Sequence, residues 1–219
     1  MSETRAYYPI QFCVEFFKGL PDPMASLELK ACIFAFDKHS TQMRKYTGEY
    51  YIVHPKNVVQ LIRELPGTTL AMLQAAWLHD VVEDTPTTMS EIETQFGMEV
   101  ALLVHALTDD PADNRNRAQR KGAALMRLSA AGAEAQTIKL ADLIDNTASI
   151  VQHDPSFAKV YLAEKAELLK VLTKGDPTLY ARAMDQVTKS WSILQEAELQ
   201  QALKPKTCCG PEGCGCCKA

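Results

Sequence analysis

The sequence predicts an all-α domain, and three observations support this fold class. Apolar residues recur at helical spacing in most segments, candidate helix caps and prolines separate these segments, and no long stretch alternates apolar and polar residues. The chain also shows no internal repeat. We therefore expect one helical domain over residues 25–203, an N-terminal extension over 1–24 and a flexible cysteine-rich tail over 204–219.

The first half of the chain contains three expected helices. Residues 25–39 are amphipathic at helical spacing. Pro55 is expected to open the second helix, because proline fits the first helical turn. Thr68 or Thr69 is expected to cap a third, strongly apolar helix that ends at His79.

The second half begins with a capping-box pattern, Thr88-Met-Ser-Glu91, for a short helix up to Phe96. Gly97 closes that helix, and an apolar stripe over 100–107 predicts the next one. Further helices are expected over 118–131 and 134–152, from Pro155 onward, and, after the breaks at Gly175 and Pro177, up to about Leu203.

The composition is that of a globular protein with a sizeable core, since 47% of the 219 residues are apolar and 23% are charged. A net charge of −4 argues against a general nucleic-acid-binding surface. No segment resembles a membrane span, and the first residues lack the apolar core of a signal peptide. We expect a cytoplasmic protein with mostly reduced cysteines and with neither a membrane nor a nucleic-acid partner. None of these features indicates an oligomeric state.

Five cysteines gather in the last twelve residues, where glycine and proline separate them: Cys208, Cys209, Cys214, Cys216 and Cys217. Such a segment cannot build an apolar core, so a flexible tail is the expected structure. Thiolates at this density could bind a soft metal such as zinc or copper(I). However, neither the paired C-x-x-C spacing of a structural zinc site nor a histidine accompanies them.

His79 and Asp80 are the first candidates for a functional site. They end the apolar helix in the stretch AAWLHDVVEDT, and Glu83 and Asp84 follow within one turn. An adjacent imidazole and carboxylate can bind one divalent cation, which would explain charged groups at the end of a buried helix. For these residues taken alone, a helix cap with solvated acids is the alternative.

His54 and Asp142 extend the candidate site. His54 precedes Pro55 at an expected helix start, where a packed or capping histidine is the alternative to a ligand. Asp142 lies in the apolar helical stretch IKLADLIDN, where a core-facing aspartate needs either a Lys or Arg partner or a metal. Together with His79 and Asp80 they form a mixed nitrogen and oxygen ligand set, which suits manganese, zinc, iron or magnesium.

The order H…HD…D is the signature of the HD-domain phosphohydrolases, and longer stretches narrow the resemblance. GEYYIVHP, LHDVVEDTPTT, FGMEVALLVHALT and IKLADLIDN closely resemble the hydrolase domain of the RelA/SpoT family and the free-standing small alarmone hydrolases. The resemblance covers about residues 30–175 and implies the helical bundle of an HD domain. We expect a hydrolase without the synthetase domain of the bifunctional members.

The resemblance also implies roles for individual residues. The family's metal ligands fall on His54, His79, Asp80 and Asp142, with Mn²⁺ as the expected metal. Its acids that orient or activate the attacking water fall on Glu83 and Asp84. Its substrate contacts fall on a base-stacking arginine, the lysine beside it and two residues near the ribose, here Arg44, Lys45, Asn146 and Ser149.

The chain departs from the family pattern in four ways. Tyr50 replaces a proline, Asp109 replaces a lysine, Leu143-Ile144-Asp145 stand where R-L-H is usual, and one extra residue lies between Lys45 and Gly48. None of these departures removes a metal ligand, but they leave open the base preference, guanine or adenine, and the exact phosphate pattern of the substrate. The basic loop over 109–121 carries Arg115, Arg117, Arg120 and Lys121, and it could hold a substrate pyrophosphate or simply be solvated.

The expected activity is metal-dependent hydrolysis of the 3′-diphosphate of ppGpp or pppGpp, which gives GDP or GTP and pyrophosphate. A related phosphohydrolase acting on pppApp, NADPH or a nucleoside monophosphate is the first alternative. The second is a non-catalytic nucleotide sensor, or a metal-binding protein that works through its cysteine tail. The presence of Glu83 and Asp84 argues against the second alternative.

Overall fold

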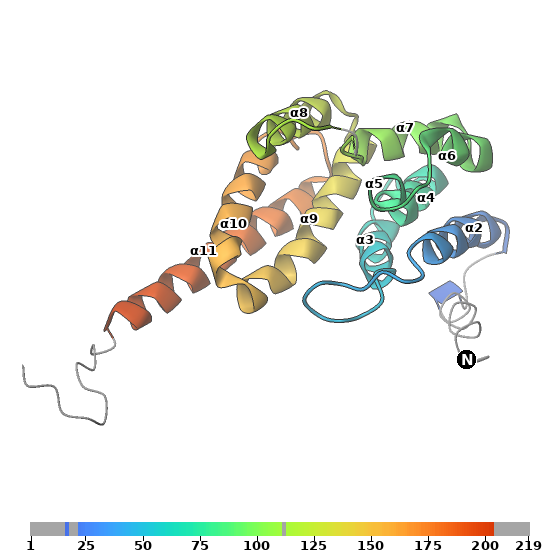
Figure 1. Ribbon diagram of the computed structural model, residues 1–219. Helices are drawn as coiled ribbons and strands as arrows, with labels where there is room; N and C mark the ends of the chain where they lie inside the picture. Colours follow the sequence, from blue (N-terminus) through green and yellow to red (C-terminus); the bar gives the residue numbers. More distant parts are fainter. Residues whose placement is uncertain (1–15, 18–21, 111–112, 204–219) are drawn as a thin grey trace, which may run out of the picture.

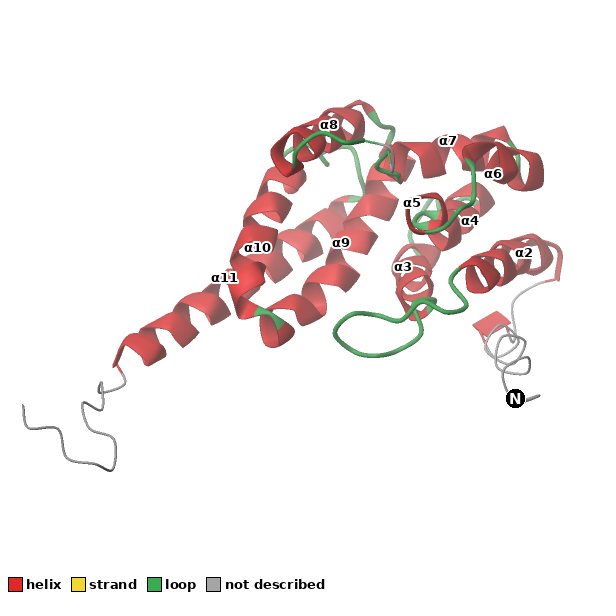
Figure 2. Ribbon diagram, in the orientation of Figure 1, coloured by secondary structure: helices red, strands yellow, loops and turns green. Residues whose placement is uncertain are grey.

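The structure is a computed structural model that describes residues 16–17, 22–110 and 113–203, and every named element in this part of the chain is an α-helix (Figure 2). The predicted all-α class is therefore confirmed. The β pairing within the same residues is a single antiparallel bridge between Met43 and Tyr50. Most of the predicted extension and the whole predicted tail, with its five cysteines, lie outside the described residues.

The helices, in chain order, are α2 (Asp22–Lys38), α3 (Val53–Arg63), α4 (Leu70–Leu78), α5 (Val81–Asp84), α6 (Met89–Phe96), α7 (Met98–Leu107), α8 (Arg117–Ala130), α9 (Ala133–His153), α10 (Pro155–Leu169) and α11 (Pro177–Leu203). Across the described ranges, none of them combines the length and apolar character that crossing a bilayer requires.

Two threonines begin helices as predicted. Thr69 accepts a hydrogen bond from the Met72 N–H at the start of α4, and Thr88 accepts one from the Glu91 N–H at the start of α6. The rest of the predicted capping box is replaced by another contact, because the Glu91 carboxylate accepts a hydrogen bond from Lys38 Nζ at 3.0 Å.

Pro55 does not open its helix as predicted. The helix α3 begins at Val53, so His54 and Pro55 both lie within its first turn. A proline is tolerated there because the first N–H groups of a helix have no intrahelical partner. His54 is consequently held by helical backbone on both sides and not only after it.

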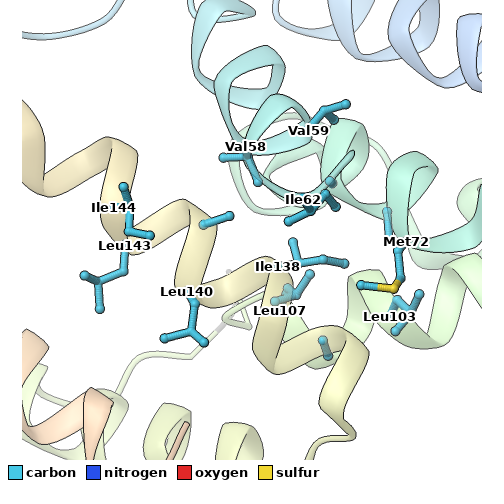
Figure 3. Close-up of a cluster of buried hydrophobic side chains, with 14 of the residues drawn as sticks. Val58, Val59, Ile62, Met72, Leu103, Leu107, Ile138, Leu140, Leu143 and Ile144 are labelled. Carbon is cyan, nitrogen blue, oxygen red and sulfur yellow. The ribbon is translucent and has the colours of Figure 1, made fainter. Parts of the chain in front are cut away.

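The central helix of the bundle is α9. It packs against α3, α4 and α7 on one side and against α10 and α11 on the other (Figure 1). Its buried residues include Ile138, Leu140, Leu143 and Ile144, and Figure 3 shows Ile138 beside Leu107 in the cluster that joins α9 to α3 and α7. Since several helices bury their apolar faces against α9, side chains on it can reach sites on both of its sides.

The loop between α10 and α11 lies directly on the first turns of α9. A Cβ atom added to Gly175 would lie 2.6 Å from Leu140 Cδ1 and 3.1 Å from the Gln136 carbonyl carbon. Gln136 holds this loop, because its Nε2 donates to the Val171 carbonyl oxygen at 3.2 Å and its Oε1 accepts from the Lys174 N–H at 2.8 Å. The close approach therefore favours glycine at position 175, because any side chain there would require Leu140 and the nearby backbone to shift.

Candidate metal centre and active site

The histidine–aspartate pair lies at the junction of α4 and α5. Residues 71–78 of α4 are all buried, so this helix carries His79 into the core at its C-terminal end. Asp80 follows as the N-cap of α5, and its Oδ2 lies 3.1 Å from His79 Nε2. The apolar helix predicted from the sequence thus positions the first two candidate ligands.

His54 and Asp142 reach the same point from α3 and α9. His54 Nε2 lies 3.2 Å from His79 Nε2, 3.3 Å from Asp142 Oδ1 and 3.5 Å from Asp80 Oδ2. One potential ligand atom from each of His54, His79 and Asp142 lies within 4.8 Å of the others, and all three residues are buried. The structure therefore brings the four predicted ligands together, with Asp80 at the edge of the group.

In His54 and His79, the hydrogen bond made by Nδ1 determines whether Nε2, which faces the cluster, carries a hydrogen or a lone pair. His79 Nδ1 lies 2.8 Å from the Ala76 carbonyl oxygen, and His54 Nδ1 lies 2.7 Å from Asp145 Oδ2. Since a carbonyl and a carboxylate only accept, each Nδ1 carries the hydrogen, and each neutral ring directs the Nε2 lone pair into the cluster. Lone pairs and carboxylates facing one another repel unless a cation lies between them. The donor set therefore fits a divalent metal ion.

The pKa shifts show the same requirement for positive charge. Burial would lower the pKa of His54, but its contacts with Asp142, Asp145 and Asp80 outweigh burial and raise that pKa well above its usual value. Burial would likewise lower the pKa of His79, and the charge of Asp80 raises it instead. Protons on the imidazoles or a divalent cation can supply the positive charge that the carboxylates require.

Asp142 has an amine partner in addition to the imidazoles. Its Oδ1 faces His54, whereas its Oδ2 lies 2.6 Å from Lys139 Nζ, one turn earlier on α9. Asn146 Nδ2 also donates to Asp142 Oδ1 at 2.5 Å. A lysine partner and a metal were the alternatives for Asp142. Because its two oxygens face different groups, the same carboxylate can bond Lys139 and still offer Oδ1 to a metal.

Asp145, which the sequence marks only as a departure from the family pattern, supports the cluster. It accepts from His54 Nδ1 and from Asn57 Nδ2, each at 2.7 Å, and its Oδ2 lies 2.9 Å from the Arg44 guanidinium. Bonds of this kind orient a ligating imidazole and fix its tautomer. The position could have been found from the sequence, because residues three apart share a helix face and Asp145 follows Asp142 by three.

Tyr51 and His39 were not found from the sequence. The Tyr51 hydroxyl donates to Asp80 Oδ2 at 2.5 Å. The His39 ring packs on the Tyr51 ring with 4.7 Å between centroids, and His39 Nδ1 lies 2.7 Å from Gln42 Oε1. These contacts depend on the path of the loop between α2 and α3, which no motif in the sequence determines.

Glu83 and Asp84 lie on the exposed face of α5, beside the cluster. Glu83 Oε2 accepts from the Asp109 N–H at 3.2 Å, and Asp84 Oδ2 accepts from Gln42 Nε2 at 2.8 Å. Although Glu83 is an exposed residue, the loss of hydration at its carboxylate and the nearby charge of Asp80 raise its pKa. The two acids therefore have different surroundings, and Glu83 holds a proton more readily than an ordinary glutamate does.

The four predicted substrate-contacting residues come from two elements, the loop between α2 and α3 and the helix α9. Arg44 lies in the loop between α2 and α3, where its guanidinium pairs with Asp145. Lys45 is exposed and turns toward the Tyr46 ring, 4.8 Å from its centroid, so the structure does not bring it into the cluster. Asn146 contacts Asp142, while Ser149 lies in α9 with a side chain outside the described part of the structure.

The basic segment over 109–121, expected as a loop, is partly helical, because α8 begins at Arg117 and includes Arg120 and Lys121. Arg115 pairs with Asp113 at 2.6 Å and Arg117 with Glu164 at 2.8 Å. A hollow of about 230 Å³ lies beside the metal centre, and its lining consists of Glu83, Asp109, Asp110, Arg117, Arg120 and Lys121. The first turns of α8 therefore bring positive charge to the hollow that Glu83 lines.

Comparisons with known proteins agree with this geometry. A family model described as HD domain matches residues 31–189. The guanosine-3′,5′-bis(diphosphate) 3′-pyrophosphohydrolase MESH1 of Xenopus tropicalis is 40% identical over 136 residues, which cover 60% of this chain and 73% of that protein. An Aquifex aeolicus guanosine-3′,5′-bis(diphosphate) 3′-pyrophosphohydrolase is 35% identical over 177 residues, 77% of this chain but 22% of that longer protein.

A solved structure extends the comparison to the fold. This structure, of a metazoan SpoT orthologue described as hydrolysing ppGpp, aligns with a TM-score of 0.69 at 27% identity, and the alignment covers 75% of this chain and 95% of the other. All four residues of the candidate metal centre lie within residues 31–189, the range of the HD-domain match. The chain therefore belongs to the HD-domain family and, within it, to the group of small RelA/SpoT-type hydrolases that includes MESH1.

Proposed function

We propose that this chain is a divalent-metal-dependent hydrolase of guanosine alarmones, which converts ppGpp or pppGpp to GDP or GTP and pyrophosphate. The observation that carries the proposal is the buried cluster of His54, His79 and Asp142, with Asp80 at its edge and two exposed acids beside it. This cluster occurs in a chain that is 40% identical to a MESH1 protein over 136 residues.

The proposed metal ligands are His54, His79, Asp80 and Asp142, and the proposed metal is Mn²⁺. A divalent cation held there would supply Lewis acidity, which makes hydroxide available near neutral pH and offsets charge on phosphoryl oxygens. The converging Nε2 lone pairs and carboxylate oxygens support this assignment. Soft-metal binding by the cysteines of the tail remains a separate prediction.

Glu83 and Asp84 are the proposed acids that handle the attacking water. The raised pKa of Glu83 makes this carboxylate a stronger proton acceptor than an ordinary glutamate, which suits it to take the proton of the water. Asp84 is oriented by Gln42 and would align the same water. Attack at the phosphorus nearest the ribose forms a bond from the water oxygen to that phosphorus and breaks its bond to the 3′ oxygen. The attacked phosphorus departs in pyrophosphate, and the 3′ oxygen takes up a proton to become the hydroxyl of GDP or GTP.

Arg44, Lys45, Asn146 and Ser149 are the proposed nucleotide contacts. The Asp145 carboxylate holds the Arg44 guanidinium, so its plane is available in a fixed position for stacking on a purine. Asn146 is fixed by its bond to Asp142, which suits its amide to a ribose hydroxyl close to the cluster. Lys45, from the exposed surface, would meet the nucleotide from the solvent side.

The test is pyrophosphate release from ppGpp by the purified protein, with Mn²⁺ and then with EDTA, beside pppApp and NADPH. We expect Mn²⁺-dependent release from ppGpp. Glu83→Gln should lower turnover by about 10²-fold or more, because it removes the proton acceptor, but it should retain bound Mn²⁺. His79→Ala is the matched variant that should lose both turnover and metal.

Two outcomes would contradict the proposal. Turnover of only pppApp or NADPH would leave the metal centre in place and assign the chain to another nucleotide. Bound Mn²⁺ with no turnover of any substrate would favour the nucleotide sensor.

A further inference from the structure

Three lysines converge on a cavity on the side of α9 opposite α3. Lys121 of α8, Lys139 of α9 and Lys165 of α10 line a cavity of about 280 Å³, whose walls also include Leu125, Leu128 and Leu168. Cations next to apolar walls attract an anion more strongly than cations in open solvent, because little water screens them. The cavity thus combines positive charge with low hydration.

The carboxylates around this cavity are paired with other cations. Asp109 pairs with Arg127, Glu164 with Arg117 and Glu167 with Lys170. Lys139 has Asp142 as its partner at 2.6 Å. Over the described ranges, no ion pair joins Lys121 or Lys165 to a carboxylate.

Lys165 is partly buried in the wall of the cavity. Its Nζ lies 4.8 Å from the centroid of the Tyr161 ring, one helical turn earlier on α10. Burial, followed by the charges of Lys139 and Lys121, lowers the pKa of Lys165 to about 8. A cation in these surroundings is unfavourable by itself, and a bound anion would remove that disadvantage.

The cavity lies next to the hollow beside the metal centre. Asp109 and Lys121 line both spaces, and Glu83 lines the hollow. Lys139 connects the cavity to the metal centre directly, through its bond to Asp142. A row of cations therefore leads from the predicted site of water attack, past Lys121, to Lys165.

We propose that Lys121, Lys139 and Lys165 form the subsite that receives the outer phosphate of the substrate's 3′-diphosphate and then holds the departing pyrophosphate. This inference rests on the proposed hydrolase activity. Several ammonium groups from different helices match an anion with many oxygens, and each can form charge-assisted hydrogen bonds with it. The subsite would make the chain select a 3′-diphosphate over a 3′-monophosphate.

The decisive experiment measures binding of inorganic pyrophosphate and of orthophosphate to the full chain loaded with Mn²⁺, by calorimetry. Lys165→Met should weaken pyrophosphate binding by about tenfold or more, because it removes a charged hydrogen-bond donor, and should change orthophosphate binding by less than about threefold. Lys165→Arg should restore most of the affinity. Lys189→Met is the matched control, since this exposed lysine lies on α11 and pairs with Asp185, away from the cavity.

Turnover provides the second readout. In Lys165→Met the KM for ppGpp should rise and product inhibition by pyrophosphate should weaken by similar factors, and Lys121→Met should reproduce both effects from a different helix. Pyrophosphate binding that is unchanged in both variants would overturn the subsite. Binding measurements do not require turnover, so an inactive wild-type protein would contradict the proposed function while the titrations still decide on the subsite.

Discussion

The two sides of α9 near Asp142 differ in what each requires. Toward α3 and α4, imidazoles and carboxylates face one another and lack only positive charge. Toward α8 and α10, three lysines line a partly apolar cavity, and in the described part of the chain no ion pair joins two of them, Lys121 and Lys165, to a carboxylate. Asp142 belongs to both sides, since one of its oxygens faces His54 and the other bonds Lys139. The difference shows that a cation site and an anion site can lie on opposite sides of one helix, with only the Asp142 carboxylate between them.

The two sides also differ in how firmly their side chains are held. His54 and His79 each have an outer partner, the Asp145 carboxylate and the Ala76 carbonyl, so their inner nitrogens are fixed. Lys165 has a long side chain that contacts the Tyr161 ring. We therefore expect a metal to bind with little reorganisation and an anion to order the lysines when it binds.

The largest effect is expected from Asp142→Ala, because it removes the group shared by both sides. Bound Mn²⁺ should be lost, and turnover should fall by about 10³-fold or more, since a metal contributes several kcal/mol to stabilising the transition state. Metal content and pyrophosphate release measure the two losses. Asp185→Ala, at an exposed carboxylate that pairs with Lys189, is the control that should change neither. Tight Mn²⁺ binding in Asp142→Ala would show that Asp142 is not a required metal ligand and does not link the two sides of α9.

Asp145→Asn should affect mainly the metal side. It weakens the bond that orients His54, and such changes lower metal affinity by about 10- to 100-fold. Competition with a chelator measures this affinity. At saturating Mn²⁺, pyrophosphate affinity should stay within about threefold of wild type, because none of the three lysines contacts Asp145. Asn57→Ala removes a different bond to Asp145 and should have a smaller effect. Equal metal affinity in wild type and Asp145→Asn would show that the histidines are oriented without this carboxylate.

The smallest effect is expected on the free energy of unfolding of Lys165→Met, and the sign of this change is informative. Folding lowers the pKa of Lys165 from 10.5 to about 8, so the folded protein disfavours the charged form. The resulting destabilisation is fully present below pH 8 and fades as the pH rises from 8 to 10.5. At pH 7 and without an anion, Lys165→Met should therefore be more stable than wild type by about 1–3 kcal/mol.

Urea unfolding at pH 7 and pH 10 measures this difference, which should shrink at the higher pH. The charged or titratable groups around Lys165 are Lys121, Lys139, Asp142, Tyr161 and Glu164, and the cavity walls add Asp109, Arg127 and Glu167. Because all of them remain in the variant, the comparison isolates Lys165. A variant less stable than wild type at pH 7 would show that Lys165 already has a sufficient partner in the folded chain.

The features that were predictable from the sequence depend on residues close together in the chain. The all-α class and the caps at Thr69 and Thr88 follow from local patterns, and α4 ends beside His79 as its apolar run indicates. The start of α3 was misplaced because a proline fits anywhere in a first turn. Asp109 and Glu164 neutralise some cations and not others, and this selection depends on packing between helices. No local pattern could therefore distinguish Lys165 from the exposed Lys170.

Gly175 has a consequence for how the chain tolerates change. It lies in a loop at the surface, yet a single added carbon there would press on Leu140 and on the Gln136 backbone. These residues lie near Lys139 in the N-terminal half of α9. A displacement of α9 toward one side would narrow the site on that side and widen the site on the other, because the cation site and the anion site lie on opposite sides of the helix. A peripheral glycine thus sets the alignment between the two halves of the site without touching either of them.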